Sequence, residues 1–202
     1  MFKAAGNMRA VQLKVDWVKK WLHKSVGIAQ NLAAFAIVEC MMFPVIFAII
    51  YWMVSEKNIP LDGFFLGNQF IARDEGIHGD VGVLIYTEFL TNVVKLPQDL
   101  VYEMISGAVE VEEEFVKEAF DGNKLPGMTA DKLIQYSKFL ADRTLEQLGY
   151  EPLYSVESPF TFMKNQGMCG RTDYFSKRVS EYRFDTHDGQ DSSSFSIIND
   201  DI

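Results

Sequence analysis

The sequence has few basic residues for its size. Nineteen Lys and Arg stand against 28 Asp and Glu, which gives a formal net charge of −9 and an isoelectric point near 4.8. Nucleic-acid surfaces need clustered Lys and Arg to displace counterions from phosphate. The composition therefore argues against direct nucleic-acid binding.

Cysteine is almost absent as well. Only Cys40 and Cys169 occur, too few for the disulfide framework of a secreted domain and not in C-x-x-C spacing. The first 25 residues carry charges throughout and lack the compact apolar core of a secretory signal. These absences predict a reducing, cytoplasmic setting.

Apolar side chains are abundant and recur at helical spacing. Hydrophobic residues make up 48% of the chain, enough for a sizeable core in one domain. They recur three and four apart without convincing period-two runs, so the predicted class is all-α. We expect helices over residues 8–24, 28–55 and 62–93, from the LPQD segment to residue 120, from 130 to 148 with Thr129 as N-cap, and a short one ending near Tyr182.

One apolar run raises the question of a membrane span. Residues 32–54 form a stretch of 23 residues with a single charge, long enough to cross a bilayer. Glu39 lies well inside this stretch, where an acidic group costs roughly 2.5–3.5 kcal/mol on insertion scales, and Pro44 interrupts it. A helix buried on all sides in a bundle is equally apolar, so the run alone allows both interpretations.

Two residues of metal-binding type lie in the third predicted helix. Glu75 and His78 stand three apart in IARDEGIHGD, which places both side chains on one face about one turn apart. Bundles that hold di-iron or di-manganese pairs use a Glu-x-x-His from each of two helices and one carboxylate from each of two others. Carboxylate oxygens and imidazole nitrogens suit both metals.

The surroundings of this pair favour a metal site over a solvated helix face. Arg73 and Asp74 lie on the same turn of an otherwise apolar helix, where buried polar groups need partners. One interpretation pairs Arg73 with Asp74 or Glu75 in an internal salt bridge, and the other uses Asp74 to orient a metal-bound histidine. Only the metal interpretation also explains Glu39, because a bound cation would compensate the charge of a carboxylate in an apolar helix.

Longer strings of the sequence resemble one family. FAIVECMMF, followed after about thirty residues by FIARDEGIHGD, is similar to the two ligand-bearing helices of the class I ribonucleotide reductase small subunit. The similarity continues through VEVEEEF, FLADRTLEQLGY, ESPFTFM and RTDYFSKRVSEY, and covers most of residues 10–182. It implies a partial ferritin-like helical bundle over residues 1–182 and a buried helix, not a membrane span, at residues 32–54.

The resemblance assigns roles to residues near the two helices. Glu39, Glu75 and His78 correspond to iron ligands, so the chain would supply half of a di-iron site, with manganese as the alternative metal. The residues that match the apolar pocket around the family's stored tyrosyl radical are Phe43, Phe47 and Ile71.

A route for the radical is implied as well. Asp74, with Arg73 beside it, matches a residue on the family's proton-coupled electron path, and Tyr182 matches the tail tyrosine that relays the radical onward. Residues 183–202 have a Ser run and no Lys or Arg after Arg183, and they predict a flexible acidic tail that docks to the large subunit. Its apolar anchors would be Phe195, Ile197, Ile198 and Ile202.

Half of the family's ligand set has no counterpart in these residues. The family needs six metal ligands, and no second Glu-x-x-His occurs in the 202 residues. The resemblance places the other three ligands, the radical-bearing tyrosine and the first tryptophan of the electron path on helices N-terminal to this sequence. An acidic run further along the chain offers carboxylates that could in principle replace the absent ligands: Glu110, Glu112, Glu113 and Glu114. Acidic runs of this kind are typically solvated helix faces, so we do not expect these residues to bind the metals.

The resulting hypothesis is part of a split or truncated small subunit of ribonucleoside-diphosphate reductase, an oxidoreductase of deoxyribonucleotide biosynthesis for DNA replication. It would be inactive without an N-terminal small-subunit fragment and the large subunit, and it would form a homodimer once completed. Two alternatives stay open. Another ferritin-like di-iron oxidase or oxygenase would have no need of Tyr182 and the docking tail, and an inactive remnant would act only as a binding partner.

Overall fold

The regular structure of the chain is helical wherever the structure describes it. The computed structural model describes residues 8–90, 95–120 and 127–165. The chain divides into two units, Met1–Thr172 and Asp173–Ile202, and every described residue belongs to the first. No strand occurs in the described ranges, which confirms the all-α class. The predicted short helix ending near Tyr182 and the division of the chain at residue 182 lie outside those ranges and stay predictions.

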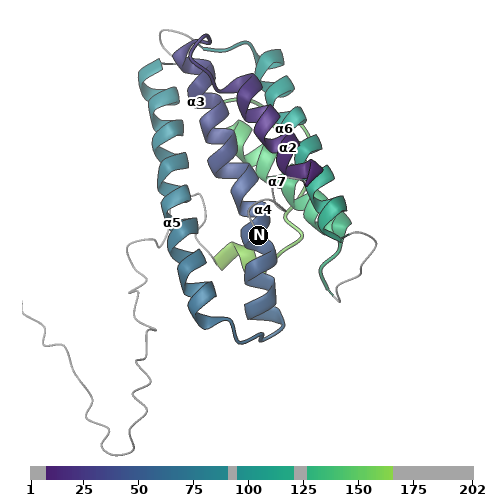
Figure 1. Ribbon diagram of the computed structural model, residues 1–202. Helices are drawn as coiled ribbons and strands as arrows, with labels where there is room; N and C mark the ends of the chain where they lie inside the picture. The colour runs from purple at the N-terminus through teal and green to yellow at the C-terminus, as the bar shows by residue number, and fades with distance from the viewer. Residues whose placement is uncertain (1–7, 91–94, 121–126, 166–202) are drawn as a thin grey trace, which may run out of the picture. The chain divides into compact units, whose positions relative to one another are not determined.

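Five long helical segments form the described unit (Figure 1). The predicted helix starts are reproduced within a residue or two, and Thr129 caps its helix by accepting a hydrogen bond from the Lys132 backbone N–H at 3.2 Å. The elements are α2 (Arg9–Trp21), α3 (Ile28–Ile37), η1 (Val38–Met42), α4 (Phe43–Tyr51), η2 (Trp52–Glu56), α5 (Asp62–Leu84), η3 (Ile85–Leu90), α6 (Gln98–Phe120), α7 (Ala130–Gln147) and η4 (Phe162–Asn165).

The apolar helix contains two π-helical turns that hydropathy did not predict. Elements α3, η1, α4 and η2 follow one another without a break, and η1 and η2 are the π turns. Pro44 is the second residue of α4, two residues after the end of η1. It has no backbone N–H, so the Cys40 carbonyl lacks its usual i+4 donor there. A π turn at this point admits one extra residue into the helix, and such turns are frequent at functional sites.

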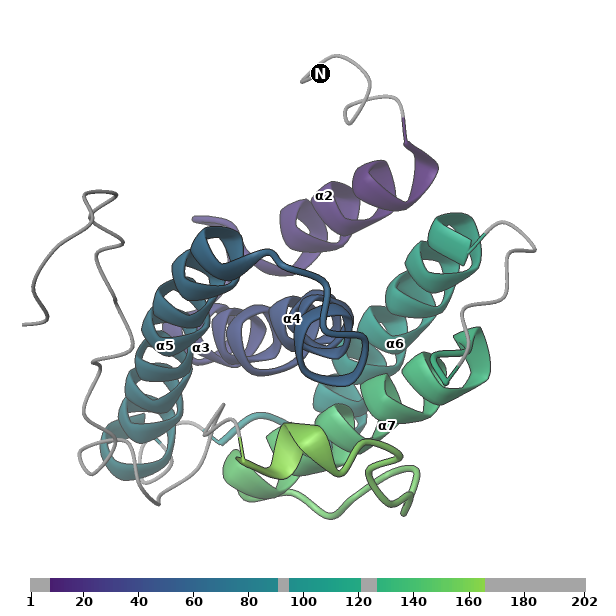
Figure 2. The same ribbon diagram turned by 90° about the horizontal axis from the view of Figure 1, so that it is seen from below.

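This helix lies at the centre of the described unit. Its stretch Ile28–Val54, with a mean hydropathy of 2.4, is long and apolar enough to cross a membrane, but 72% of its most apolar window is buried inside the structure. Seen from below in Figure 2, α5 lies on one side of α3 and α4, and α6 and α7 lie on the other. The burial fits the core helix of a bundle.

Helices α2, α6 and α7 close one side of this central helix. Helix α6 packs between α2 and α7. The indole N–H of Trp17 on α2 donates to the Met104 carbonyl on α6 at 3.1 Å, and Lys14 forms an ion pair with Glu112 at 2.5 Å. Polar groups buried at a helix interface are tolerated because they are paired in this way.

Helix α5 is covered on one side only by the helices described here. Its inner edge carries Ala72, Gly79 and Gly82, which are buried, with Gly79 next to η1 and Gly82 next to α3. Large apolar side chains elsewhere on the helix are between 43% and 67% exposed: Phe64, Phe70, Ile71, Ile77, Val81, Leu84 and, on η3, Phe89. We call these seven residues the α5 face. So many exposed large apolar side chains on one helix often mark an interaction site.

Candidate metal centre

Glu39 is the buried carboxylate of the central helix. It lies in the π turn η1 and is only 7% exposed, and the other buried residues of that turn, Cys40, Met41 and Met42, carry no charge. An ionised carboxylate in such surroundings is costly to bury unless a counter-charge or a metal ion accompanies it. The π turn displaces Glu39 from the regular helical ladder and contributes to where its side chain lies.

Glu75 and His78 lie on α5, across from Glu39. The Nδ1 atom of His78 is 3.3 Å from Oε2 of Glu75, so the two side chains meet on one face as their spacing predicts. The Glu75 side chain is 20% exposed and that of His78 is 56% exposed. The pair therefore occupies the border between the buried interior and the uncovered side of α5.

The three side chains form one cluster. One ligand atom from each of Glu39, Glu75 and His78 lies within 4.8 Å of the others. Two carboxylates and one imidazole are the donor set that iron and manganese accept in helix bundles. The residues present thus fit one half of a dinuclear site, with the ligands contributed by two packed helices.

Arg73 and Asp74 do not lie where the sequence predicted. We expected polar groups packed into an apolar helix, yet both side chains are exposed on α5. The physical reason is that none of the described helices covers this side of α5, so the apolar residues around them are exposed as well. Their predicted roles on an electron path remain predictions.

The three residues of the predicted radical pocket are not enclosed together. Phe47 is buried and stacks on Tyr51 with ring centroids 6.4 Å apart, and Phe43 is half-buried. Ile71 belongs to the α5 face and is 48% exposed. A closed pocket that includes Ile71 would require another element against α5.

The acidic run on α6 contains an exception to the predicted solvated face. Glu110 is exposed, and Glu113 and Glu114 are half-buried, as expected for such a face. Glu112 is fully buried and pairs with Lys14 of α2. Burial raises the pKa of this carboxyl to about 7, and the neighbouring Lys14 opposes the rise. Glu112 is not a member of the cluster that Glu39, Glu75 and His78 form.

The remaining predicted residues lie outside the ranges that the structure describes. They are Tyr182, Phe195, Ile197, Ile198 and Ile202.

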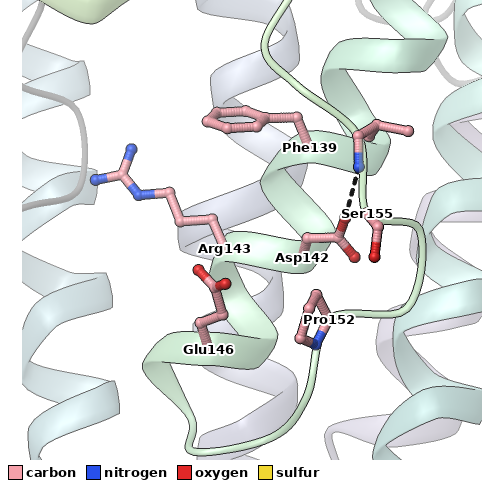
Figure 3. A pocket seen from close by; sticks show the side chains of 7 residues that line it. Phe139, Asp142, Arg143, Glu146, Pro152 and Ser155 are labelled. Carbon is pink, nitrogen blue, oxygen red and sulfur yellow. Dashed lines mark hydrogen bonds between the residues drawn. The ribbon is translucent and has the colours of Figure 1, made fainter.

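A separate pocket of about 490 Å³ lies beside α7 (Figure 3). Its lining includes Asp142, whose carboxylate accepts hydrogen bonds from the backbone N–H groups of Leu153 at 2.8 Å, Tyr154 at 2.7 Å and Val156 at 3.3 Å. This carboxylate holds the segment after α7 in place. Its acceptor capacity is used by the backbone, which indicates a structural role.

Comparisons with known proteins agree with the geometry of the bundle. The family model described as "Ribonucleotide reductase, small chain" matches residues 1–159. The chain is 36% identical over 197 residues to the ribonucleoside-diphosphate reductase small chain of Vaccinia virus (strain Copenhagen), which covers 98% of this chain and 60% of that relative. It is 38% identical over 184 residues to ribonucleoside-diphosphate reductase subunit M2 of Danio rerio, covering 91% of this chain and 46% of the relative.

A solved structure is similar as well. The Rnr4 homodimer of the ribonucleotide reductase from Saccharomyces cerevisiae matches with a TM-score of 0.67 and 29% sequence identity, over 81% of this chain and 50% of that one. The chain thus spans 60% or less of the length of these relatives. The ferritin-like helical fold is confirmed by this likeness, and the chain belongs to the ribonucleotide reductase small-chain family.

Proposed function

We propose that these 202 residues provide half of the dinuclear metal site of a ribonucleoside-diphosphate reductase small subunit. The observation that carries the proposal is the cluster of Glu39, Glu75 and His78 within 4.8 Å, in a chain of this family. Iron is the expected metal and manganese the alternative, because the donor set suits both. The other three ligands would come from outside the 202 residues.

The uncovered α5 face supports the proposal that half of the metal ligands come from outside the 202 residues. A complete site of this kind draws ligands from four helices, and only two of the described elements, η1 and α5, contribute to the cluster. Covering the α5 face would bury seven large apolar side chains and shield His78 from water. We expect the helices that carry the missing ligands to pack there, whether they belong to the same polypeptide or to another.

When bound, the metal pair would supply the oxidation of a tyrosine by dioxygen. Glu39, Glu75 and His78 would hold the metals, and the buried apolar side chains beside Glu39 in η1 and α4 would exclude water from that side of the site. Asp74, next to Glu75, would accept and return a proton along the route by which the radical equivalent leaves. Tyr182 would relay it to a large subunit, and nucleotide reduction would occur on that partner, in a cytoplasmic setting.

Metal content and radical signal test the half-site. The 202-residue chain is incubated with Fe(II) and then with air, alone and with a polypeptide that bears the N-terminal helices of a relative. We expect weak iron binding and no tyrosyl radical from the chain alone, and both signals from the mixture by iron analysis and electron paramagnetic resonance. Stoichiometric di-iron together with a tyrosyl radical from the chain alone would contradict the proposal. A mixture that never binds metal would favour an inactive remnant.

Deletion of residues 190–202 tests the docking role of the tail. If the tail carries Phe195, Ile197, Ile198 and Ile202 to a large subunit, its removal abolishes reductase activity while the iron content stays unchanged. An oxidase or oxygenase that acts without a large subunit would be indifferent to the deletion. Activity that survives the deletion would therefore contradict the docking assignment.

A further inference from the structure

We propose that Gly79 and Cys40 form a positioning pair that sets the spacing between the two helices carrying the metal ligands. Gly79 directly follows His78 on α5, and Cys40 directly follows Glu39 in η1. The inference rests on the proposed metal site and adds two residues that bind no metal themselves.

A side chain at Gly79 would meet the central helix more closely than one at Gly82. A Cβ atom built on Gly79 would overlap the Sγ atom of Cys40 and would come within 3.5 Å of the Glu39 Cβ atom. Such an overlap between a Cβ atom and sulfur does not occur in real structures, so something would have to shift. The thiol thus lies in a notch that exists only because residue 79 has no side chain.

The surroundings leave the thiol little room to move elsewhere. Cys40 is 2% exposed, and its neighbours in η1, Met41 and Met42, are buried as well. Interiors are packed tightly enough that one added methyl group is felt. Alanine at position 79 would therefore push α5 away from η1 or force the Cys40 backbone out of place.

Either displacement would also move the metal ligands, because Glu39 and His78 directly precede Cys40 and Gly79 in the sequence. Moving η1 relative to α5 separates Glu39 from Glu75 and His78, whose ligand atoms now lie within 4.8 Å of one another. Metal–ligand distances tolerate only about 0.2 Å, so a shift of about an ångström removes a ligand from the set. The notch thus determines whether the carboxylate of one helix can share a metal with the pair on the other.

Other glycines of α5 serve as matched controls. A Cβ atom on Gly82 would come to 3.0 Å from the Phe35 ring, which is a tight contact one turn beyond the ligands. A Cβ atom on Gly67 would meet nothing within 4 Å. Gly67→Ala controls for the general effect of replacing a helical glycine with alanine. Gly82→Ala controls for a tight contact that lies away from the metal ligands.

The test is a double-mutant cycle of Gly79→Ala and Cys40→Ala in the 202-residue chain, read by titration with Co(II) under anaerobic conditions. We expect Gly79→Ala to weaken Co(II) binding by about ten-fold or more, as changes around metal ligands typically do. Cys40→Ala alone should change affinity by less than about three-fold. The double variant should recover to within about three-fold of Cys40→Ala, since alanine leaves space where the thiol was. Gly67→Ala and Gly82→Ala should bind like the wild type.

Thermal melts of the metal-free variants distinguish positioning from mere packing. A Gly79→Ala variant that melts at a lower temperature but binds Co(II) like the wild type would show a purely structural pair and overturn the inference. A double variant that binds as weakly as Gly79→Ala would overturn it too. If Gly79→Ala does not fold, a folded double variant with restored binding supports the pair, and an unfolded one contradicts it. A wild-type chain that takes up no Co(II) even when mixed with a polypeptide bearing the N-terminal helices of a relative would contradict the metal site itself.

Discussion

At the scale of single residues, Glu112 and Lys14 link a buried charge to stability. Burial raises the pKa of the Glu112 carboxyl from its ordinary 4.5 to about 7, with Lys14 opposing the rise. The folded chain therefore retains this proton up to about pH 7, whereas the unfolded chain releases it near pH 4.5. Between these values the unfolded state binds fewer protons, so this group lowers the free energy of unfolding as the pH rises.

Glu112→Gln removes this dependence. Going from pH 5 to pH 8, the wild type should lose more stability than the variant by about 2 kcal/mol, because each pKa unit corresponds to about 1.4 kcal/mol. Urea unfolding at both pH values measures the difference. Glu103→Gln is the matched control, since Glu103 and Lys20 form an exposed ion pair at 3.0 Å between the same two helices. Equal pH dependence in Glu112→Gln and wild type would contradict the prediction.

A substitution at His78 should affect metal binding but not the stability of the fold. Its side chain is 56% exposed, so His78→Ala should leave the free energy of unfolding of the metal-free chain within about 0.5 kcal/mol. Loss of the imidazole should nevertheless weaken Co(II) binding by about ten-fold or more. His23→Ala is the control, because His23 is exposed on the loop after α2. Unchanged Co(II) affinity in His78→Ala would remove this residue from the ligand set.

At the scale of elements, Asp142 joins α7 to the segment that follows it. Its carboxylate accepts hydrogen bonds from three backbone N–H groups, those of Leu153, Tyr154 and Val156. Asp142→Ala would leave these donors without their charged acceptor and should lower the free energy of unfolding by about 2–3 kcal/mol. Hydrogen exchange at Leu153 and Tyr154 should accelerate strongly, whereas exchange in α2 should accelerate only as far as global stability falls. Uniform acceleration throughout the chain would contradict the local anchoring.

Much of the element order could be predicted from the sequence because the helices are amphipathic and their ends carry strong signals. Thr129 and the Gly- and Pro-containing loops define boundaries locally, and the Glu75–His78 spacing predicts their contact. The π turn around Glu39 could not be predicted, since hydropathy carries no information on hydrogen-bond register. The burial of Glu112 was missed because it depends on Lys14, which is distant in sequence.

At the scale of the whole molecule, the α5 face predicts how the chain associates. Phe70 and Leu84 lie on this face, are 43% and 52% exposed and are not metal ligands. Phe70→Lys and Leu84→Lys should each change the free energy of unfolding by less than about 1 kcal/mol. Each should weaken the binding of a polypeptide that bears the N-terminal helices of a relative by about ten-fold or more, because a charge would be buried in an apolar interface.

Sedimentation of the mixed polypeptides measures this association. Ile28→Lys is the matched control, since Ile28 is an apolar side chain that is 63% exposed but does not belong to the α5 face. Equal weakening by all three variants would point to a general effect of added charge. Tight binding by Phe70→Lys and Leu84→Lys would show that the added N-terminal helices pack elsewhere.

The α5 face also bears on the lifetime of this polypeptide in a cell. Any copy whose face is uncovered presents seven large apolar side chains of the kind that chaperones and proteases recognise in incompletely assembled proteins. Copies made in excess of whatever covers that face would be removed or would aggregate. The steady-state amount of the chain should therefore follow the supply of whatever covers the α5 face, even where its own synthesis is not limiting.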